Sequence, residues 1–315
     1  MIDKLVDNIQ VVSVNISEKK GTIKKPVKEI ILTKNGVEHD AHAGDWHRQV
    51  SFLGVESIQK FKKLLSRELF FGEFAENITT SGMLLYKASP LDRFKIGETE
   101  IEITQIGKEC HGNSCAIFQE IGSCVMPKEG IFGRVIRPGK INAGMLMEYL
   151  PRTYKILIIT LSDRASRGEY SDRSGPEIEK KTKEYLDGIN WRYQIDYQVI
   201  PDDGEQLREL LKKAKEENVD IVFTTGGTGI GPRDITPDVV RELLDKEITG
   251  IMDMIRLKYG ENKPNALLSR SVAGVMGESL VYTLPGSVKA VREYLSEIFK
   301  TLQHLIFMLH GIDAH

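Results

Sequence analysis

Residues 220–238 read DIVFTTGGTGIGPRDITPD, and this stretch decides the fold of the second half of the chain. The mostly apolar run Asp220–Thr225 predicts a buried parallel strand. A glycine-rich loop follows it, and we expect a helix to begin at Pro237 with Thr236 as its N-cap. Glycines at the carboxyl end of a strand let the backbone approach an anion, to which the amide groups donate hydrogen bonds. The candidate anion-binding residues are Gly226, Gly227, Thr228 and Gly229.

The loop differs from the two best-known phosphate-binding glycine motifs. A P-loop requires a lysine before its Ser or Thr, and the loop contains none. The dinucleotide-binding pattern G-x-G-x-x-G fails because Pro232 stands where the third glycine should be. A plain glycine turn is the alternative, but Arg233, Asp234 and the Thr-Pro-Asp sequence after them favour a binding loop.

Strands and helices alternate on either side of this loop. Alternation of this kind predicts parallel βαβ units with helices on both faces of one sheet, which is a three-layer α/β domain. The expected strands are Lys155–Leu161, Arg192–Ile200 and Leu280–Leu284, and the expected helices are Gly175–Leu186, Glu205–Glu217 and Val288–Met308.

Polar residues follow the other strands at the point where each strand ends. Because the carboxyl ends of parallel strands meet at one crevice, we expect these residues to share a pocket with the glycine loop. Each of them alone could be an ordinary helix cap. They are Ser162, Asp163 and Arg164 after the first strand, Asp202 after the second, and Pro285, Gly286 and Ser287 after the last.

The first half of the chain has a different pattern, with short apolar runs that glycines interrupt. Many short strands with few helices predict a compact β-rich domain. The pattern changes near residue 150, so we expect two domains, 1–150 and 151–315. The expected strands are Val11–Ile16, Glu29–Thr33, Thr99–Ile106 and Gly133–Ile136, and one helix is expected over Val55–Leu65.

Composition excludes several classes of protein. Lys and Arg total 43 against 45 Asp and Glu, so the net charge of −2 argues against nucleic acid as the main partner. No run approaches the roughly 20 apolar residues of a membrane span, and Met1–Gln10 is too charged for a signal peptide. The three cysteines, Cys110, Cys115 and Cys124, form an odd and local set, which predicts reduced thiols in a cytoplasmic protein.

Histidines and cysteines of the first half could bind a metal. The segment that holds His39, Asp40, His42, Asp45 and His47 suggests either a metal site or the lining of a polar pocket, and we favour the lining. The cysteines lack the second pair that structural zinc usually requires, so zinc is the less favoured interpretation.

The second half resembles the MoaB/Mog family of molybdenum-cofactor biosynthesis proteins. The matching segments are TTGGTGIGPRDITPD from Thr224, SDRASRGEYSDRSGP from Ser162, VIPDD from Val199, LLSRSVAG from Leu267 and LPGSVKAV from Leu284. The resemblance implies Mg-ATP-dependent adenylylation of molybdopterin with release of pyrophosphate. It also implies a homo-oligomer, a trimer or a hexamer. Some members of the family have lost or unclear activity.

The resemblance assigns roles to residues. Two aspartates that are critical in the family match Asp202, the expected Mg²⁺ or Mg-ATP partner, and Asp234, a second metal-linked or pterin-orienting carboxylate. The glycine loop would hold phosphate, and Ser287 at a helix start would bind the pterin phosphate. Ser162, Asp163 and Arg164 would line the same pocket.

The first half resembles the MOSC domain, a β-rich fold that we expect to form a barrel. The matching segments are GVEHDAHAGDWHRQVSFLGVES from Gly36, GEFAENITTSG from Gly72, FKIGETEIEIT from Phe94 and EGIFGRVIRPGKINAG from Glu129. The resemblance implies binding of the molybdenum cofactor or transfer of sulfur, with a cysteine that can meet the metal. Cys115 fits that cysteine best, with Cys110 and Cys124 as alternatives, and incidental buried thiols are the other interpretation.

Two cofactor-handling modules in one chain predict a bifunctional biosynthetic enzyme, because fusion raises the effective concentration of a shared ligand. Its expected ligands are molybdopterin, ATP and Mg²⁺, with the molybdenum cofactor at the MOSC domain and transient contacts to other cofactor-biosynthesis proteins. A non-catalytic protein that binds and carries the pterin is the first alternative. A scaffolding protein is the second, but it would need long linkers and partner motifs that we do not find.

Overall fold

The computed structural model describes residues 8–62, 68–108 and 124–312. The chain divides into two compact units between Arg152 and Thr153, and each unit has its own hydrophobic core. The expected two-domain organisation is thus confirmed. Across the described ranges, every helix is too short or too polar to cross a bilayer.

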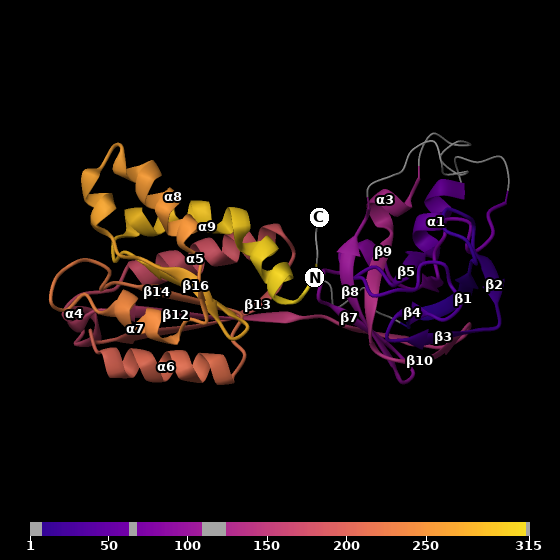
Figure 1. Ribbon diagram of the computed structural model, residues 1–315, viewed down its shortest axis with the longest axis horizontal. Coiled ribbons are helices and arrows are strands. Elements are labelled where there is room, and N and C mark those ends of the chain that lie inside the picture. Colours follow the sequence, from indigo (N-terminus) through magenta and orange to yellow (C-terminus); the bar gives the residue numbers. More distant parts are fainter. Residues whose placement is uncertain (1–7, 63–67, 109–123, 313–315) are drawn as a thin grey trace. The chain divides into compact units, whose positions relative to one another are not determined.

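The first unit is built from two antiparallel-rich sheets (Figure 1). Among the described residues, the larger sheet has the strand order β11-β7-β8-β9-β5-β6-β1-β2 and the smaller has β10-β3-β4. The strands are β1 (Gln10–Ile16), β2 (Lys25–Val27), β3 (Glu29–Thr33), β4 (Gly36–Val37), β5 (Val50–Gly54), β6 (Ile78–Ser81), β7 (Arg93–Ile96), β8 (Thr99–Ile106), β9 (Ile131–Arg137), β10 (Gly139–Asn142) and β11 (Met147–Leu150). The helices are α1 (Val55–Lys62), the 3₁₀ turn η1 (Leu85–Lys87) and α3 (Met126–Glu129).

The larger sheet curls around an apolar core. Backbone hydrogen bonds join β1 to the chain around the start of β11: Val11 N donates to Met145 O at 2.9 Å, and Met147 N donates to Ile9 O at 2.8 Å. The core within the curl includes Phe52 and Phe94, whose ring centroids lie 5.6 Å apart. The strands expected in this half are present, and the barrel form stays a prediction.

The second unit contains one mixed sheet with the strand order β13-β12-β14-β17-β16-β15. The first four strands are parallel as expected, while β16 and β15 add an antiparallel edge that the sequence pattern did not predict. The strands are β12 (Thr153–Leu161), β13 (Arg192–Ile200), β14 (Ile221–Thr225), β15 (Lys246–Glu247), β16 (Ala273–Met276) and β17 (Ser279–Leu284). The helices are α4 (Asp163–Ser166), α5 (Ser174–Gly188), α6 (Gly204–Glu216), α7 (Thr236–Leu243), α8 (Thr249–Gly260), the 3₁₀ turn η3 (Pro264–Leu268) and α9 (Val288–Leu309).

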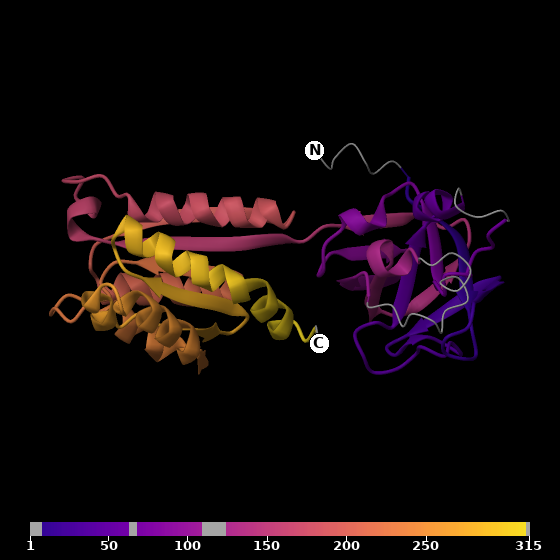
Figure 2. The ribbon, with the colours of Figure 1, turned by 90° about the horizontal axis from the view of Figure 1, so that it is seen from above.

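Helices cover both faces of this sheet and complete the expected three layers (Figure 1). The buried side of α6, which includes Leu207 and Leu211, packs with Leu157 of β12 in one apolar cluster. On the other face, Tyr185 of α5 stacks on Phe299 of α9 with ring centroids 4.4 Å apart. Figure 2 looks onto the face that α5 and α9 cover.

The four parallel strands end together. Leu161 at the end of β12 is opposite Ile200 at the end of β13, and the last residue of β14, Thr225, is opposite Leu284 at the end of β17. Thr225 is also opposite Thr160 of β12. Each segment that follows a strand therefore starts from the same edge of the sheet.

The expected cap of the helix after the glycine loop is wrong. The helix begins at Thr236, and Ile235 is the N-cap residue, with no hydrogen bond from its side chain. The Thr236 amide donates to Gly227 O at 3.2 Å. The buried Thr236 hydroxyl lies in the space that a side chain at position 227 would take. Thr236 therefore packs against Gly227 of the glycine loop instead of capping the helix.

A buried carboxylate joins α8 to α9. The side chain of Glu297 is 5% exposed, and it accepts hydrogen bonds from Lys258 at 2.6 Å and from Lys300 at 2.7 Å. These two lysines lower the pKa of Glu297 from its ordinary range to about 2. A lowered pKa means that folding favours the ionised carboxylate of Glu297. Its contacts with the two lysines therefore stabilise the fold at pH values above the ordinary carboxyl pKa.

We predict that Glu297→Gln lowers the free energy of unfolding near pH 7 by about 1 kcal/mol, because the amide keeps the shape but loses the charge between two partly exposed lysines. The difference between wild type and variant should be constant above the ordinary glutamate pKa and should shrink as the pH falls from there towards 2. Thermal unfolding at several pH values measures it. A difference that stays constant in acid would contradict the role of the charge.

Candidate functional site

The glycine loop after β14 requires glycine at two positions. Gly226 has φ +99° and Gly227 has φ +61°, in the left-handed region that other residues rarely adopt. A side chain at position 226 would also overlap the carbonyl oxygen of Leu161. The Gly226 amide donates to Leu284 O at 3.1 Å, so the loop lies directly against the ends of β12 and β17.

The rest of the loop folds around Asp234. Its Oδ2 accepts a hydrogen bond from the Gly231 amide at 2.7 Å, and the Asp234 amide donates back to Gly231 O at 3.0 Å. A side chain at Gly229 would collide with the same carboxylate. Glycine at this position therefore lets the Asp234 carboxylate lie against the loop backbone.

Asp163 and Asp202 join the ends of β12 and β13. The Asp163 amide donates to Asp202 Oδ2 at 3.3 Å, and the Asp202 amide donates to Asp163 Oδ1 at 3.0 Å. Beside them, Ser162 caps α4 by accepting a hydrogen bond from the Ala165 amide at 3.2 Å. Each aspartate thereby fixes the backbone that carries the other.

The carboxylates from separate strands share one electrostatic environment. Burial raises the pKa of Asp202, and the negative charge of Asp234 raises it further. Arg233 compensates part of this charge, since its guanidinium pairs with Asp163 and lies 3.9 Å from Asp202. The structure thus gathers Asp163, Asp202, Arg233 and Asp234 at one edge of the sheet.

The segment after β17 lies beside the glycine loop. Thr225 Oγ1 donates to Pro285 O at 3.0 Å, and a side chain added at Gly286 would lie 3.5 Å from Gly226 Cα. The exposed Ser287 caps α9 by accepting a hydrogen bond from the Ala290 amide at 3.2 Å. The start of a long helix therefore stands next to the loop.

Two predicted residues of the pocket differ in placement. Thr228 is buried beneath the loop, whereas Arg164 is exposed and places its guanidinium 5.7 Å from the centroid of the Tyr170 ring. Arg164 is thus paired with an aromatic ring on its own loop, and Arg233 supplies the positive charge beside Asp163 and Asp202.

Sequence reasoning missed two further polar residues. Asp172 accepts hydrogen bonds from Thr160 at 2.8 Å and Tyr197 at 2.6 Å, and so anchors the loop between α4 and α5 to β12 and β13. Burial alone would raise the pKa of Asp172, but hydrogen bonds from Tyr197, Ser174 and Thr160 hold it below its ordinary value. Arg270 donates to the glycine loop at Gly229 O, 2.8 Å away. Both residues lie in segments that carry the resemblance, SDRASRGEYSDRSGP and LLSRSVAG, and that was the available signal.

The donor set of this edge suits a magnesium ion. Mg²⁺ prefers oxygen ligands and is usually held by one or two carboxylates together with phosphate oxygens. Asp163 and Asp202 supply such carboxylates, and they already lie against one cationic group, Arg233. Nowhere in the described residues do three or more His, Cys, Asp or Glu side chains meet as a metal site.

The histidine-rich segment of the first unit is held by a buried ion pair. Lys24 Nζ lies 2.5 Å from Asp40 Oδ2, and both side chains are buried. His42 Nδ1 lies 3.3 Å from the other oxygen of Asp40. Burial alone would raise the pKa of Asp40, but His42 and Lys24 hold it far below its ordinary range. These contacts make Asp40 the ion-pair partner of Lys24 and place the His42 ring beside it.

The remaining residues of the first unit that we singled out lie beside this segment, in an apolar cluster or outside the described residues. His39 has φ +62°, and Trp46, beside Asp45 and His47, donates its indole N–H to His42 O at 2.8 Å. Cys110 and Cys115 lie outside the described residues. Cys124 is half-buried and packs against the apolar cluster that contains Val125 and Met126.

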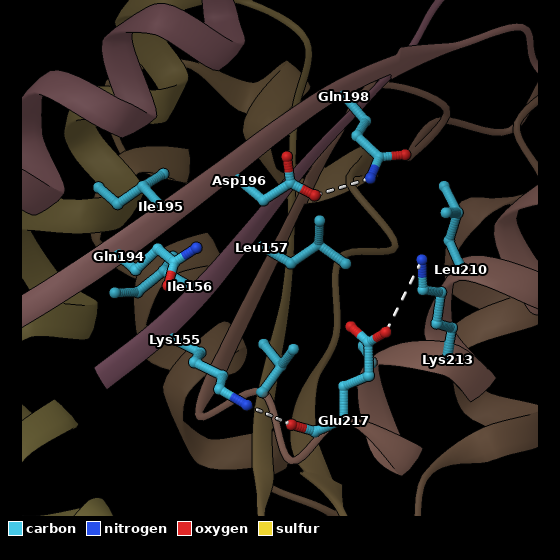
Figure 3. A pocket seen from close by; sticks show the side chains of 12 residues that line it. Lys155, Ile156, Leu157, Gln194, Ile195, Asp196, Gln198, Leu210, Lys213 and Glu217 are labelled. Carbon is cyan, nitrogen blue, oxygen red and sulfur yellow. Dashed lines mark hydrogen bonds and ion pairs between the residues drawn. The ribbon is translucent and has the colours of Figure 1, made fainter. Parts of the chain in front are cut away.

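A groove of about 460 Å³ lies elsewhere on the second unit, between α6 and the strands β12 and β13 (Figure 3). Several of its polar groups bind one another: Lys155 donates to the backbone oxygen of Glu217 at 2.8 Å, Lys213 pairs with the Glu217 carboxylate at 3.7 Å, and Gln198 donates to Asp196 at 2.8 Å. None of the predicted site residues lines it. The groove is therefore separate from the edge that holds the aspartates.

Comparison with known families and proteins matches both halves of the chain. Residues 157–304 match the family described as "Probable molybdopterin binding domain", and residues 39–148 match the MOSC domain. The chain is 35% identical to the molybdopterin adenylyltransferase of Helicobacter pylori strain J99 over 161 residues, which are 51% of this chain and 90% of that protein.

Two further relatives match the same half. Molybdenum cofactor biosynthesis protein B of Staphylococcus carnosus is 39% identical over 164 residues, 51% of this chain and 93% of that protein. Gephyrin of Dictyostelium discoideum is 36% identical over 160 residues, and the match spans 49% of this chain but only 22% of gephyrin. The second half thus corresponds to nearly the whole length of the two bacterial proteins. Through this half the chain belongs to the MoaB/Mog family of molybdenum-cofactor biosynthesis proteins, and a MOSC domain precedes it.

Proposed function

We propose that the second unit adenylylates molybdopterin with Mg-ATP. The observation that carries the proposal is that Asp163, Asp202 and Asp234 all belong to segments that leave the sheet at the edge where the glycine loop lies. Relatives at 35–37% identity are named molybdopterin adenylyltransferases, and the match covers about nine-tenths of their length.

The reaction joins two phosphates and therefore brings several negative charges together. An oxygen of the pterin phosphate attacks the α-phosphorus of ATP, and the bond from this phosphorus to the bridging oxygen of the β-phosphate breaks. The electron pair of that bond leaves with pyrophosphate. Catalysis of such a transfer consists mainly of positioning and charge neutralisation. Bound Mg²⁺ would supply neutralisation at the triphosphate.

We assign a separate role in this transfer to each residue of the site. Asp202, with Asp163 beside it, would hold Mg-ATP, and Asp234 would orient the pterin or contact the metal. Backbone amides of Gly226, Gly227 and Gly229 would bind phosphate, and Ser287 at the start of α9 would bind the pterin phosphate. Arg233 offsets part of the charge of Asp163 and Asp202 and would help to neutralise the developing charge.

The decisive experiment is incubation of the protein with molybdopterin, ATP and Mg²⁺, followed by detection of pyrophosphate and of adenylylated pterin. Formation of both products supports the proposal. Tight binding of molybdopterin without either product would favour the alternative, a non-catalytic carrier.

We predict that Asp202→Asn and Asp234→Asn each reduce adenylyl transfer by at least about 100-fold, because the amide cannot supply the negative charge that positions the metal and the phosphates. The affinity for molybdopterin alone should change much less. Pyrophosphate release measures the first effect and pterin fluorescence titration the second.

Asp203→Asn is the matched control for these variants. Asp203 is adjacent to Asp202, but its carboxylate caps α6 by accepting hydrogen bonds from the amides of Glu205 at 2.8 Å and Gln206 at 3.3 Å. Asparagine caps helices about as well as aspartate, so Asp203→Asn should keep both stability and turnover. Full turnover in Asp202→Asn and Asp234→Asn would refute their assignment.

For the first unit we propose that the MOSC domain forms a barrel that binds the molybdenum cofactor or receives sulfur. The backbone bonds between β1 and residues 144–147 support the barrel. A thiolate is a good ligand for molybdenum and a good acceptor of persulfide sulfur, which is why we assign this role to Cys115. We further propose a cytoplasmic homo-oligomer that meets other cofactor-biosynthesis proteins transiently.

We predict that Cys115→Ser in the full chain reduces retention of mature cofactor or loading with sulfur, because a hydroxyl replaces the thiolate. Adenylyl transfer should be unchanged, since the site on the second unit contains no cysteine among the residues that we assign to it. Bound molybdenum and protein persulfide are the measured quantities. Cys110→Ser and Cys124→Ser are the comparisons, and wild-type values in all three variants would show that the thiols are not used.

A further inference from the structure

All three guanidinium nitrogens of Arg270 donate hydrogen bonds to the loop that carries Asp234 or to the helix that follows it. Its Nε donates to Gly229 O at 2.8 Å, one terminal nitrogen donates to Asp234 O, and the other binds both oxygens of Asp238 at 2.8 and 3.0 Å. In addition, the Arg270 amide donates to Thr228 O at 2.9 Å. The residue therefore binds the loop at its beginning, at its end and at the first turn of α7.

Only arginine can make this set of contacts. The guanidinium is a planar fork with five N–H donors in fixed directions, whereas the ammonium group of lysine is a single compact charge. The side chain of Arg270 is 33% exposed, so its contacts are partly shielded from water. Two of the acceptors are loop carbonyl groups, which would lose these side-chain partners if the fork were removed.

The segment that presents Arg270 is itself fixed by a second arginine. Arg256 of α8 donates to Ser271 O at 3.0 Å and to Ser269 O at 3.4 Å, the residues on either side of Arg270. It also pairs with Asp253 on its own helix at 2.6 Å. The backbone of Arg270 is thus held from α8 while its side chain holds the loop.

The loop needs such support because, after Gly226 on the sheet and the buried Thr228, its own sequence provides little. Between Gly226 and Asp234 it contains four glycines, which lose more conformational entropy on ordering than any other residue. Ile230 and Pro232 are exposed and contribute no buried anchor. The side-chain contact of Asp234 to Gly231 is local, so it cannot fix the loop relative to the sheet.

We propose that Arg270 is a positioning residue for adenylyl transfer, and this inference rests on the proposed function. Arg270 orders residues 228–238 before substrate arrives, and so sets the place of the Asp234 carboxylate and of the phosphate-binding amides. It touches the loop backbone and Asp238, and it acts on the reacting phosphates only through them.

The test compares Arg270→Lys and Arg270→Gln with wild type in the full chain. The expected result is a fall of kcat by about 10- to 100-fold, because small errors in the position of a catalytic group are costly. The affinity for molybdopterin should change little. Hydrogen–deuterium exchange of peptides covering residues 226–236 should become faster, while exchange of β12 and β17 stays as in wild type.

Arg241→Gln is the matched control. Arg241 also pairs with a carboxylate at the surface of this unit, Glu247 at 3.4 Å, and it belongs to the same helix as Asp238. It should leave kcat and loop exchange unchanged. If Arg270→Lys keeps wild-type kcat and wild-type exchange of the loop, the inference is overturned.

The outcomes separate this inference from the proposed function. Absence of adenylyl transfer in wild type would refute the proposed function, while faster loop exchange in Arg270→Gln would still show that the arginine orders the loop. A fall in kcat with unchanged loop exchange, or a loss of thermal stability that accounts for the whole fall, would refute the positioning role.

Discussion

The site of the second unit depends on the register of four parallel strands. Because β12, β13, β14 and β17 pair up to their last residues, the segments after them all start from one edge of the sheet. The glycines of the loop then allow a close approach of backbone to backbone, with the Gly226 amide on Leu284 O. The placement of three aspartates from distant segments follows from this pairing.

At that edge, the negative charge of the carboxylates is partly compensated by a positively charged side chain, which apolar packing cannot do. Burial and a neighbouring carboxylate both disfavour the ionised form of Asp202, and the Arg233 guanidinium offsets part of this cost. Such a site would suit the cation and the phosphates of the proposed reaction. In the first unit, by contrast, the buried Lys24 and Asp40 compensate each other's charge inside the fold.

Regular elements could be predicted because their residues carry a repeating pattern. The strands Arg192–Ile200, Glu29–Thr33 and Thr99–Ile106 were predicted with the bounds that the structure has. Short elements leave no such pattern, and β15, with two residues, was missed for this reason. The start of α7 was misplaced because Thr236 looks like a cap in sequence but packs beneath Gly227 in the fold.

The site was predictable where residues follow strands directly and unpredictable where a long side chain reaches back from elsewhere. Asp202 belongs to the first class, and Asp234 was predicted from the motif of the glycine loop. Arg270 and Lys24 belong to the second, because their partners lie far away in sequence and no local spacing reveals them.

The register of the sheet also determines where this fold can change in length. An extra residue inside a parallel strand would turn every later side chain to the other face and move the end of the strand by about 3.3 Å. The turns at the opposite edge have no such effect on the site. Asn190 before β13 and Asn218 before β14 make these turns in left-handed conformation, with φ +56° and +52°. Insertions and deletions accumulated during evolution should therefore concentrate at these turns, far from the ends of the strands.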